Sequence, residues 1–129
     1  MIRNKAQVQE YLLNKLKKSS PDIIETAIVS SDGLVLVSTA KETEYKEKIS
    51  AFAASIFKPS EKAASDLLLS RISFILVSGT ERTIYIKEIS QNLLLAVIAK
   101  RGSDWDKIQT QIGTAVVDLR NINEMKGNL

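Results

Sequence analysis

The chain has no cysteine and no histidine among its 129 residues. Their absence excludes disulfide bonds, zinc sites of the Cys/His type, imidazole general bases and cysteine nucleophiles. Only two prolines and five glycines occur, and the glycines are too scattered for a phosphate-binding Gly-x-x-x-x-Gly-Lys loop. We therefore expect no catalytic residue, no bound metal and no cofactor.

Long apolar runs and a strong charge of one sign are also missing. No run approaches the roughly 18 residues of a membrane span, and the amino-terminal stretch MIRNKAQVQEYLL lacks the apolar block of a signal peptide. Lysine and arginine number 18 against 15 aspartate and glutamate, and the densest basic cluster, at 15–18, has no interleaved aromatic residues to stack on bases. We expect a cytoplasmic protein with no membrane span and no nucleic-acid partner.

The composition that remains is that of a folded domain. Hydrophobic residues make up 44% and charged residues 26% of the chain, close to the average of globular proteins. A chain of 129 residues lies within the usual size of one domain. We expect a single domain over residues 1–129, in which residues 121–129 form a polar tail that frays.

Two stretches have the apolar spacing of amphipathic helices, the first over residues 3–18 and the second over residues 44–69. Their apolar stripes consist of Val8, Leu12 and Leu16 in the first and of Tyr45, Ile49, Phe52 and Ile56 in the second. Pro59 interrupts the second stretch. Because proline in a helix interior costs about 3 kcal/mol unless the helix adapts, we expect a kink or a break near Lys58.

A β-hairpin is predicted between these helices. The apolar runs at 23–29 and 34–38 are rich in β-branched residues and flank Asp32 and Gly33. An Asp-Gly step suits a tight turn that needs positive φ. Asp32 and Gly33 are therefore expected to act as structural turn residues.

The last part of the chain predicts three strands and a helix. Apolar segments at 72–78, 82–89 and 92–99 are separated by short polar turns, which is typical of a meander of antiparallel strands. A final amphipathic helix opens at Ser103, with Asp106 three residues later as a variant of the capping box. The expected fold class is α+β, with helices packed on one antiparallel sheet.

This order of elements, with AIVSSDGLVLVS, KISAFAASIF and RTIYIKEISQNLLLAVIA as its most specific parts, resembles the roadblock family of dynein light chains and GTPase regulators. The resemblance spans essentially the whole chain. It implies a five-stranded antiparallel sheet of order 2-1-5-4-3, with the middle helix on one face and the two terminal helices on the other. The chain departs from the family pattern at Pro59 and in the turn 79–82, which lacks a second glycine.

The resemblance also implies a dimer, formed by the middle helix and the third strand so that two sheets join. The equivalent positions here are Ile49, Phe52, Ala53, Ile56, Phe74, Ile75 and Leu76. The residues themselves agree, because an uncharged apolar strand at 72–78 would need a partner if it lies at a sheet edge. The small side chains at 51–55 would allow close approach of a second helix, but they suit packing on the chain's own sheet equally well.

The function that the resemblance implies is a non-enzymatic homodimeric platform that binds and regulates a small Ras-like GTPase, as activator, exchange factor or scaffold. Such a partner can order switch segments or supply an arginine to the phosphates, and we expect Arg71, Arg82 and Arg101 to be solvated surface instead. An adaptor or light-chain-type subunit of a motor or multiprotein complex is the alternative. A small-molecule sensor ranks last, because the strands place few polar groups inside.

Overall fold

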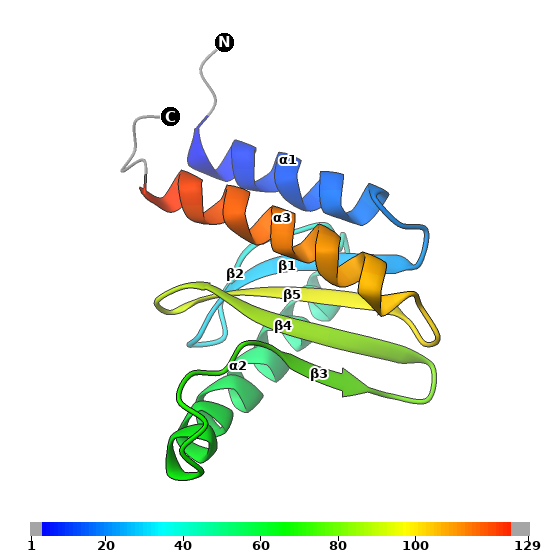
Figure 1. Ribbon diagram of the computed structural model, residues 1–129. Helices are drawn as coiled ribbons and strands as arrows, with labels where there is room; N and C mark the ends of the chain where they lie inside the picture. Colours follow the sequence, from blue (N-terminus) through cyan, green and yellow to red (C-terminus); the bar gives the residue numbers. More distant parts are fainter. Residues whose placement is uncertain (1–3, 125–129) are drawn as a thin grey trace.

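The computed structural model describes residues 4–124. Its five strands form one antiparallel sheet in the order β2-β1-β5-β4-β3 (Figure 1). The elements are α1 (Lys5–Lys18), β1 (Ile23–Ser30), β2 (Val35–Ser38), α2 (Thr43–Asp66), β3 (Ile75–Ser78), β4 (Arg82–Ser90), β5 (Leu93–Lys100) and α3 (Trp105–Glu124). The α+β class and the strand order implied by the resemblance are thereby confirmed. Between residues 4 and 124, none of the helices combines the length and the apolar character needed to span a membrane.

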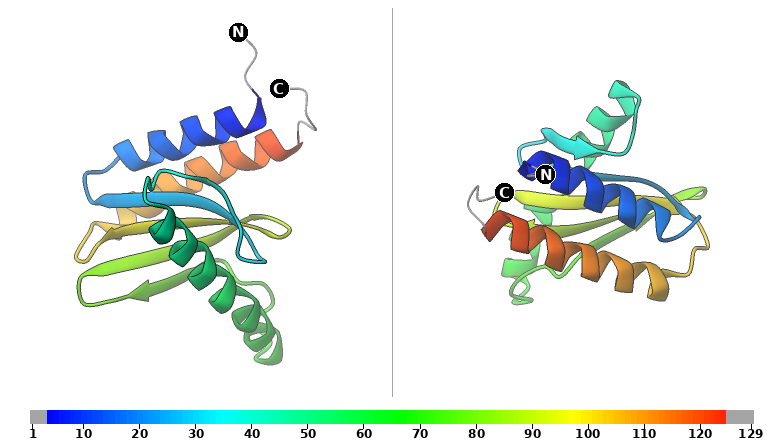
Figure 2. Two further views of the ribbon diagram at one scale, coloured as in Figure 1. Left: turned by 180° about the vertical axis from the view of Figure 1, so that it is seen from behind. Right: turned by 90° about the horizontal axis from the view of Figure 1, so that it is seen from above.

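The sheet separates two cores. Helices α1 and α3 lie side by side on one face, and α2 crosses the other (Figure 2). Strand β5 alternates between the two cores, with Leu95 and Val97 facing α1 and α3 while Leu94 and Ala96 face α2. This central strand is covered on both faces, which explains why it is an unbroken apolar run instead of an alternating one.

Helix α2 packs on the sheet through Ile49, Ala53 and Phe57. Alanine at the middle of this buried stripe lets the helix backbone approach the sheet closely, so Phe52 is left beside the contact with 40% of its surface exposed. A kink or a break was expected near Lys58; the helix is continuous through Pro59, so there is no break. Pro59 is itself exposed, and the carbonyl that loses its amide partner there is on a side of the helix where solvent can hydrate it.

The hairpin between β1 and β2 forms where the sequence predicts it. Gly33 has φ +94°, and its amide donates to the Ser30 carbonyl at 3.0 Å. Lys58 of α2 reaches Asp32 at 3.4 Å across an exposed surface, a pair that contributes little to stability. Asp32 and Gly33 are therefore turn residues in the structure.

Exchanging Gly33 and Gly113 separately for alanine should change stability in opposite directions. A Cβ at Gly33 meets only Ala54 at an ordinary 3.6 Å, so Gly33→Ala loses about 1–2 kcal/mol because of the positive φ alone. Gly113 lies inside α3 with open space around its Cα, so Gly113→Ala should gain about 0.5–1 kcal/mol. Urea unfolding of both variants checks the pair, and a shift of the same sign in both would contradict this account.

Several boundaries differ from the sequence expectations, including the end of α2, which stops at Asp66 instead of 69. Strand β3 begins at Ile75, so residues 72–74 do not join the sheet. Helix α3 is capped by Asp104, whose Oδ1 accepts from the Lys107 amide at 3.3 Å, whereas the Ser103 hydroxyl donates to the Lys100 carbonyl instead. The helix continues to Glu124, so residues 121–124 are helical and not a tail. Residues 125–129 of the expected tail lie outside the described residues.

Candidate functional site

Strand β3 forms one edge of the sheet, and within residues 4–124 it pairs with β4 alone (Figure 1). Ile75 and Val77 pack toward α2, whereas Leu76 lies opposite Tyr85 on the other face and is half-exposed. The strand carries no charged residue, and its outer backbone groups have no strand partner in the described chain. An edge of this kind is a template for pairing with another strand.

An aromatic stack stands beside this edge, on the α3 side of the sheet. The ring of Phe74 stacks on Tyr85 with centroids 5.0 Å apart, and Tyr85 stacks on Trp105 at 5.9 Å. Phe74 was expected on the third strand with Ile75, but it precedes β3, and its ring packs on Tyr85 of β4. It is held there because an offset ring contact with Tyr85 is favourable.

Tyr85 should make the protein sensitive to alkaline pH. Burial raises the pKa of its phenol above the usual 10.0, because the charged phenolate is disfavoured inside the protein. The contribution of the uncharged Tyr85 to the free energy of unfolding is therefore fully present below about pH 10. It is lost as the pH rises through the raised pKa, by at most about 1.4 kcal/mol per pH unit. Urea unfolding between about pH 8 and 11 should show a shallower fall for Tyr85→Phe than for the wild type. The same dependence of unfolding free energy on pH in both proteins would contradict this role of Tyr85.

The outer side of α2 supplies the second part of the candidate surface. Phe52 is exposed and Ile56 is partly buried, so both are available to a partner. Ile49 and Ala53, which were expected at the same interface, belong to the chain's own core, with Ile49 only 4% exposed. The small residues at 51–55 were expected to suit either a second helix or the chain's own sheet, and Ala53 packs on the chain's own sheet.

Three exposed leucines after α2, Leu67, Leu68 and Leu69, form a leucine segment that sequence reasoning missed. The helix ends in a Schellman motif, in which the Leu69 amide donates to the Ala64 carbonyl at 2.8 Å and the Leu68 amide to the Ser65 carbonyl at 3.1 Å. Leu68 occupies the left-handed position of this motif, with φ 60°. Three consecutive leucines cannot all lie on one face of a helix. The sequence therefore contained a signal that at least one of them would be exposed or that the helix would end there.

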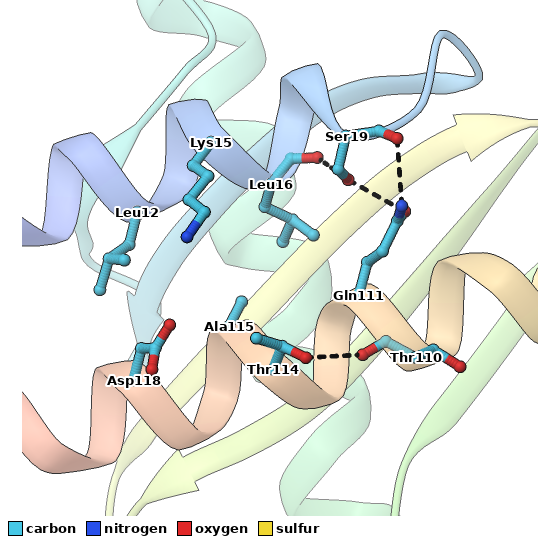
Figure 3. Close-up of a pocket in the computed structure, with 9 residues that line it drawn as sticks. All are labelled: Leu12, Lys15, Leu16, Ser19, Thr110, Gln111, Thr114, Ala115 and Asp118. Carbon is cyan, nitrogen blue, oxygen red and sulfur yellow. Dashed lines mark hydrogen bonds between the residues drawn. The ribbon is translucent and has the colours of Figure 1, made fainter.

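A cavity of about 160 Å³ lies between α1 and α3 (Figure 3). Its floor is apolar, and one end is closed by Gln111, which donates to the Ser19 carbonyl at 3.1 Å and accepts from its hydroxyl at 2.9 Å. Lys15 and Asp118 stand on its two rims (Figure 3). The volume is below the roughly 300 Å³ of ordinary ligand sites, and the polar groups at its end are already satisfied by one another.

Within residues 4–124, no group of three or more Asp and Glu side chains could hold a metal ion. Of the arginines considered above, Arg82 donates to the Tyr45 hydroxyl at 3.0 Å and Arg71 lies 3.5 Å from Glu88, while Arg101 is exposed in a turn. The candidate site is therefore a surface made of the β3 edge, the outer side of α2 and the leucine segment.

Comparisons with known proteins agree with this geometry. A Roadblock/LC7 domain from Streptomyces avermitilis has a TM-score of 0.82 and 18% identity, covering 87% of this chain and 94% of its own. Myxococcus xanthus MglB has a TM-score of 0.86 and 14% identity. A structure described as MglB with tetrameric arrangement has a TM-score of 0.84 and 16% identity. Each covers 97% of this chain and 94% of its own. No curated protein matches the chain. The Roadblock/LC7 domain profile matches residues 9–99, most of the length, so the chain belongs to the Roadblock/LC7 domain family.

Proposed function

We propose that the chain is a non-enzymatic homodimeric platform, acting in the cytoplasm, that binds and regulates a small Ras-like GTPase. The resemblance to the roadblock family carries the GTPase part of this proposal. The observation that carries the platform part is the candidate site itself: an uncharged edge strand next to an exposed aromatic residue and an exposed leucine segment. Contiguous exposed apolar groups of this kind mark protein interaction surfaces.

Pairing of two β3 edges would account for most of this surface. It would give the outer backbone groups of β3 partners and would bring the outer sides of two α2 helices near each other. One structural relative is described as tetrameric, which supports self-association in this fold. The remaining exposed surface of the joined α2 helices would then be free to contact the GTPase.

Capture experiments with nucleotide-loaded lysate test the GTPase part. The tagged protein is incubated with lysate from its native source, loaded in parallel with GDP or a non-hydrolysable GTP analogue, and the retained proteins are identified by mass spectrometry. We expect a P-loop GTPase to be enriched in one nucleotide state, and the preferred state separates activator from exchange factor or scaffold.

Two matched variants make this capture specific. Phe52→Glu alters the candidate site and should lose the GTPase, whereas Leu34→Glu places the same charge on an exposed leucine of the hairpin and should retain it. If no GTPase is retained in either state, the regulatory function is wrong, and the adaptor or light-chain-type subunit becomes the better proposal.

A further inference from the structure

The leucine segment combines exposed apolar side chains with a left-handed backbone position. Leu68 is 91% exposed, and its neighbours are 70% and 65% exposed. Its backbone is also in the left-handed region, where a leucine Cβ approaches a carbonyl oxygen and glycine is favoured. The hydrogen bonds of the Schellman motif hold this backbone in place, so the side chain is presented outward in a preorganised way.

A matching hollow lies at the other end of β3. It has a volume of about 300 Å³ and lies between the first half of α2 and the sheet. Its lining is mostly apolar and includes Phe52, Val77 and Ile84. Lys48 and Arg82 add positive charge to the lining. We call it the α2–β3 hollow.

The symmetry of a dimer brings these two features together. When a strand pairs with its own copy about a two-fold axis, the strands are antiparallel, so the Ile75 end of one β3 lies beside the Ser78 end of the other. The leucine segment precedes the Ile75 end, and the hollow adjoins the Ser78 end through Val77 and Gly79. The last turns of α2 also extend past the β3 edge of the sheet, toward the side on which a copy would lie (Figures 1 and 2).

Charged side chains next to both features have partners within their own protomer: Asp66 lies 3.8 Å from Lys62, and Lys48 in the lining of the hollow lies 3.1 Å from Glu44. Because exposed ion pairs of this kind contribute little, the contact would depend on the burial of apolar side chains. We propose that the leucine segment of each protomer seats in the α2–β3 hollow of a second copy of this chain, forming two identical contacts per dimer. This inference rests on the homodimer of the proposed function and adds the contact that sets its register.

Cross-linking between two single-cysteine variants tests the contact, and the natural absence of cysteine leaves only the engineered thiols to react. Tagged Leu68→Cys is mixed with untagged Lys48→Cys, equilibrated to allow subunit exchange, treated with a short bis-maleimide and resolved by denaturing electrophoresis. The matched control replaces Lys48→Cys with Lys107→Cys, an exposed lysine on α3 at the opposite face of the sheet.

We expect the mixed product of Leu68→Cys with Lys48→Cys at ten times or more the yield of the control mixture. Equal yields from a protein that sediments as a dimer would overturn the seating and leave the homodimer standing. A wild-type protein that sediments as a monomer at tens of micromolar would overturn both. If circular dichroism shows that Leu68→Cys unfolds, Leu69→Cys takes its place with the same two outcomes.

Discussion

Phe52→Glu should dissociate the proposed dimer, raising its Kd by roughly 100-fold, equivalent to about 2.8 kcal/mol. Phe52 is the exposed aromatic residue on the outer side of α2, and aromatic anchors dominate the energy of most interfaces. A carboxylate at this position would also have to lose hydration on entering an apolar interface. Sedimentation velocity over a concentration series measures the change.

The control for this variant is Leu34→Glu. Leu34 is also an exposed apolar residue, but it lies in the turn of the β1–β2 hairpin, at the edge of the sheet opposite to β3. The dimer Kd of Leu34→Glu should stay within about threefold of the wild-type value, which corresponds to the ordinary scatter of surface substitutions. An effect of equal size in both variants would mean that added charge, and not the α2 surface, weakens association.

Ile112→Ala should lower the free energy of unfolding by roughly 3–4 kcal/mol. Ile112 is fully buried at the centre of α3, in the core that α3, α1 and the sheet share, so its removal takes away apolar contacts and leaves a cavity. A small domain has only about 5–15 kcal/mol of total stability, so a large share of it would be lost. Urea unfolding followed by circular dichroism gives the value.

Val117→Ala on the same helix is the matched control. Val117 is exposed, so its truncation should change the unfolding free energy by no more than about 0.5 kcal/mol. A comparable loss in both variants would indicate that α3 is limited by helix propensity and not by packing on the sheet. That result would contradict the two-core description of the fold.

Local patterns in the chain were sufficient for much of the fold. The Asp32-Gly33 turn was predictable because few residue pairs tolerate positive φ, and the β5 run was recognisable as a strand because its apolar residues stand between short polar turns. The order of the strands and the division of the helices between two faces followed from the family resemblance. The N-cap of α3 was less predictable, since the side chains of Ser103, Asp104 and Asp106 can all accept a hydrogen bond from a backbone amide.

The candidate site depended on more distant contacts. Phe52 and Ala53 are neighbours in the same apolar pattern, and only the close approach of α2 to the sheet decides that Ala53 is buried while Phe52 stays accessible. Phe74 precedes β3, and only the folded chain brings its ring against Tyr85 of β4.

The chain's residues thus determined its class, its turns and the elements that form it, because propensity and periodicity act over a few neighbouring positions. Tertiary structure decided which side of α2 faces outward, where β3 begins and that Leu67–Leu69 project from the molecule. Exposure depends on what packs against a residue from far along the chain, and no local pattern contains that information.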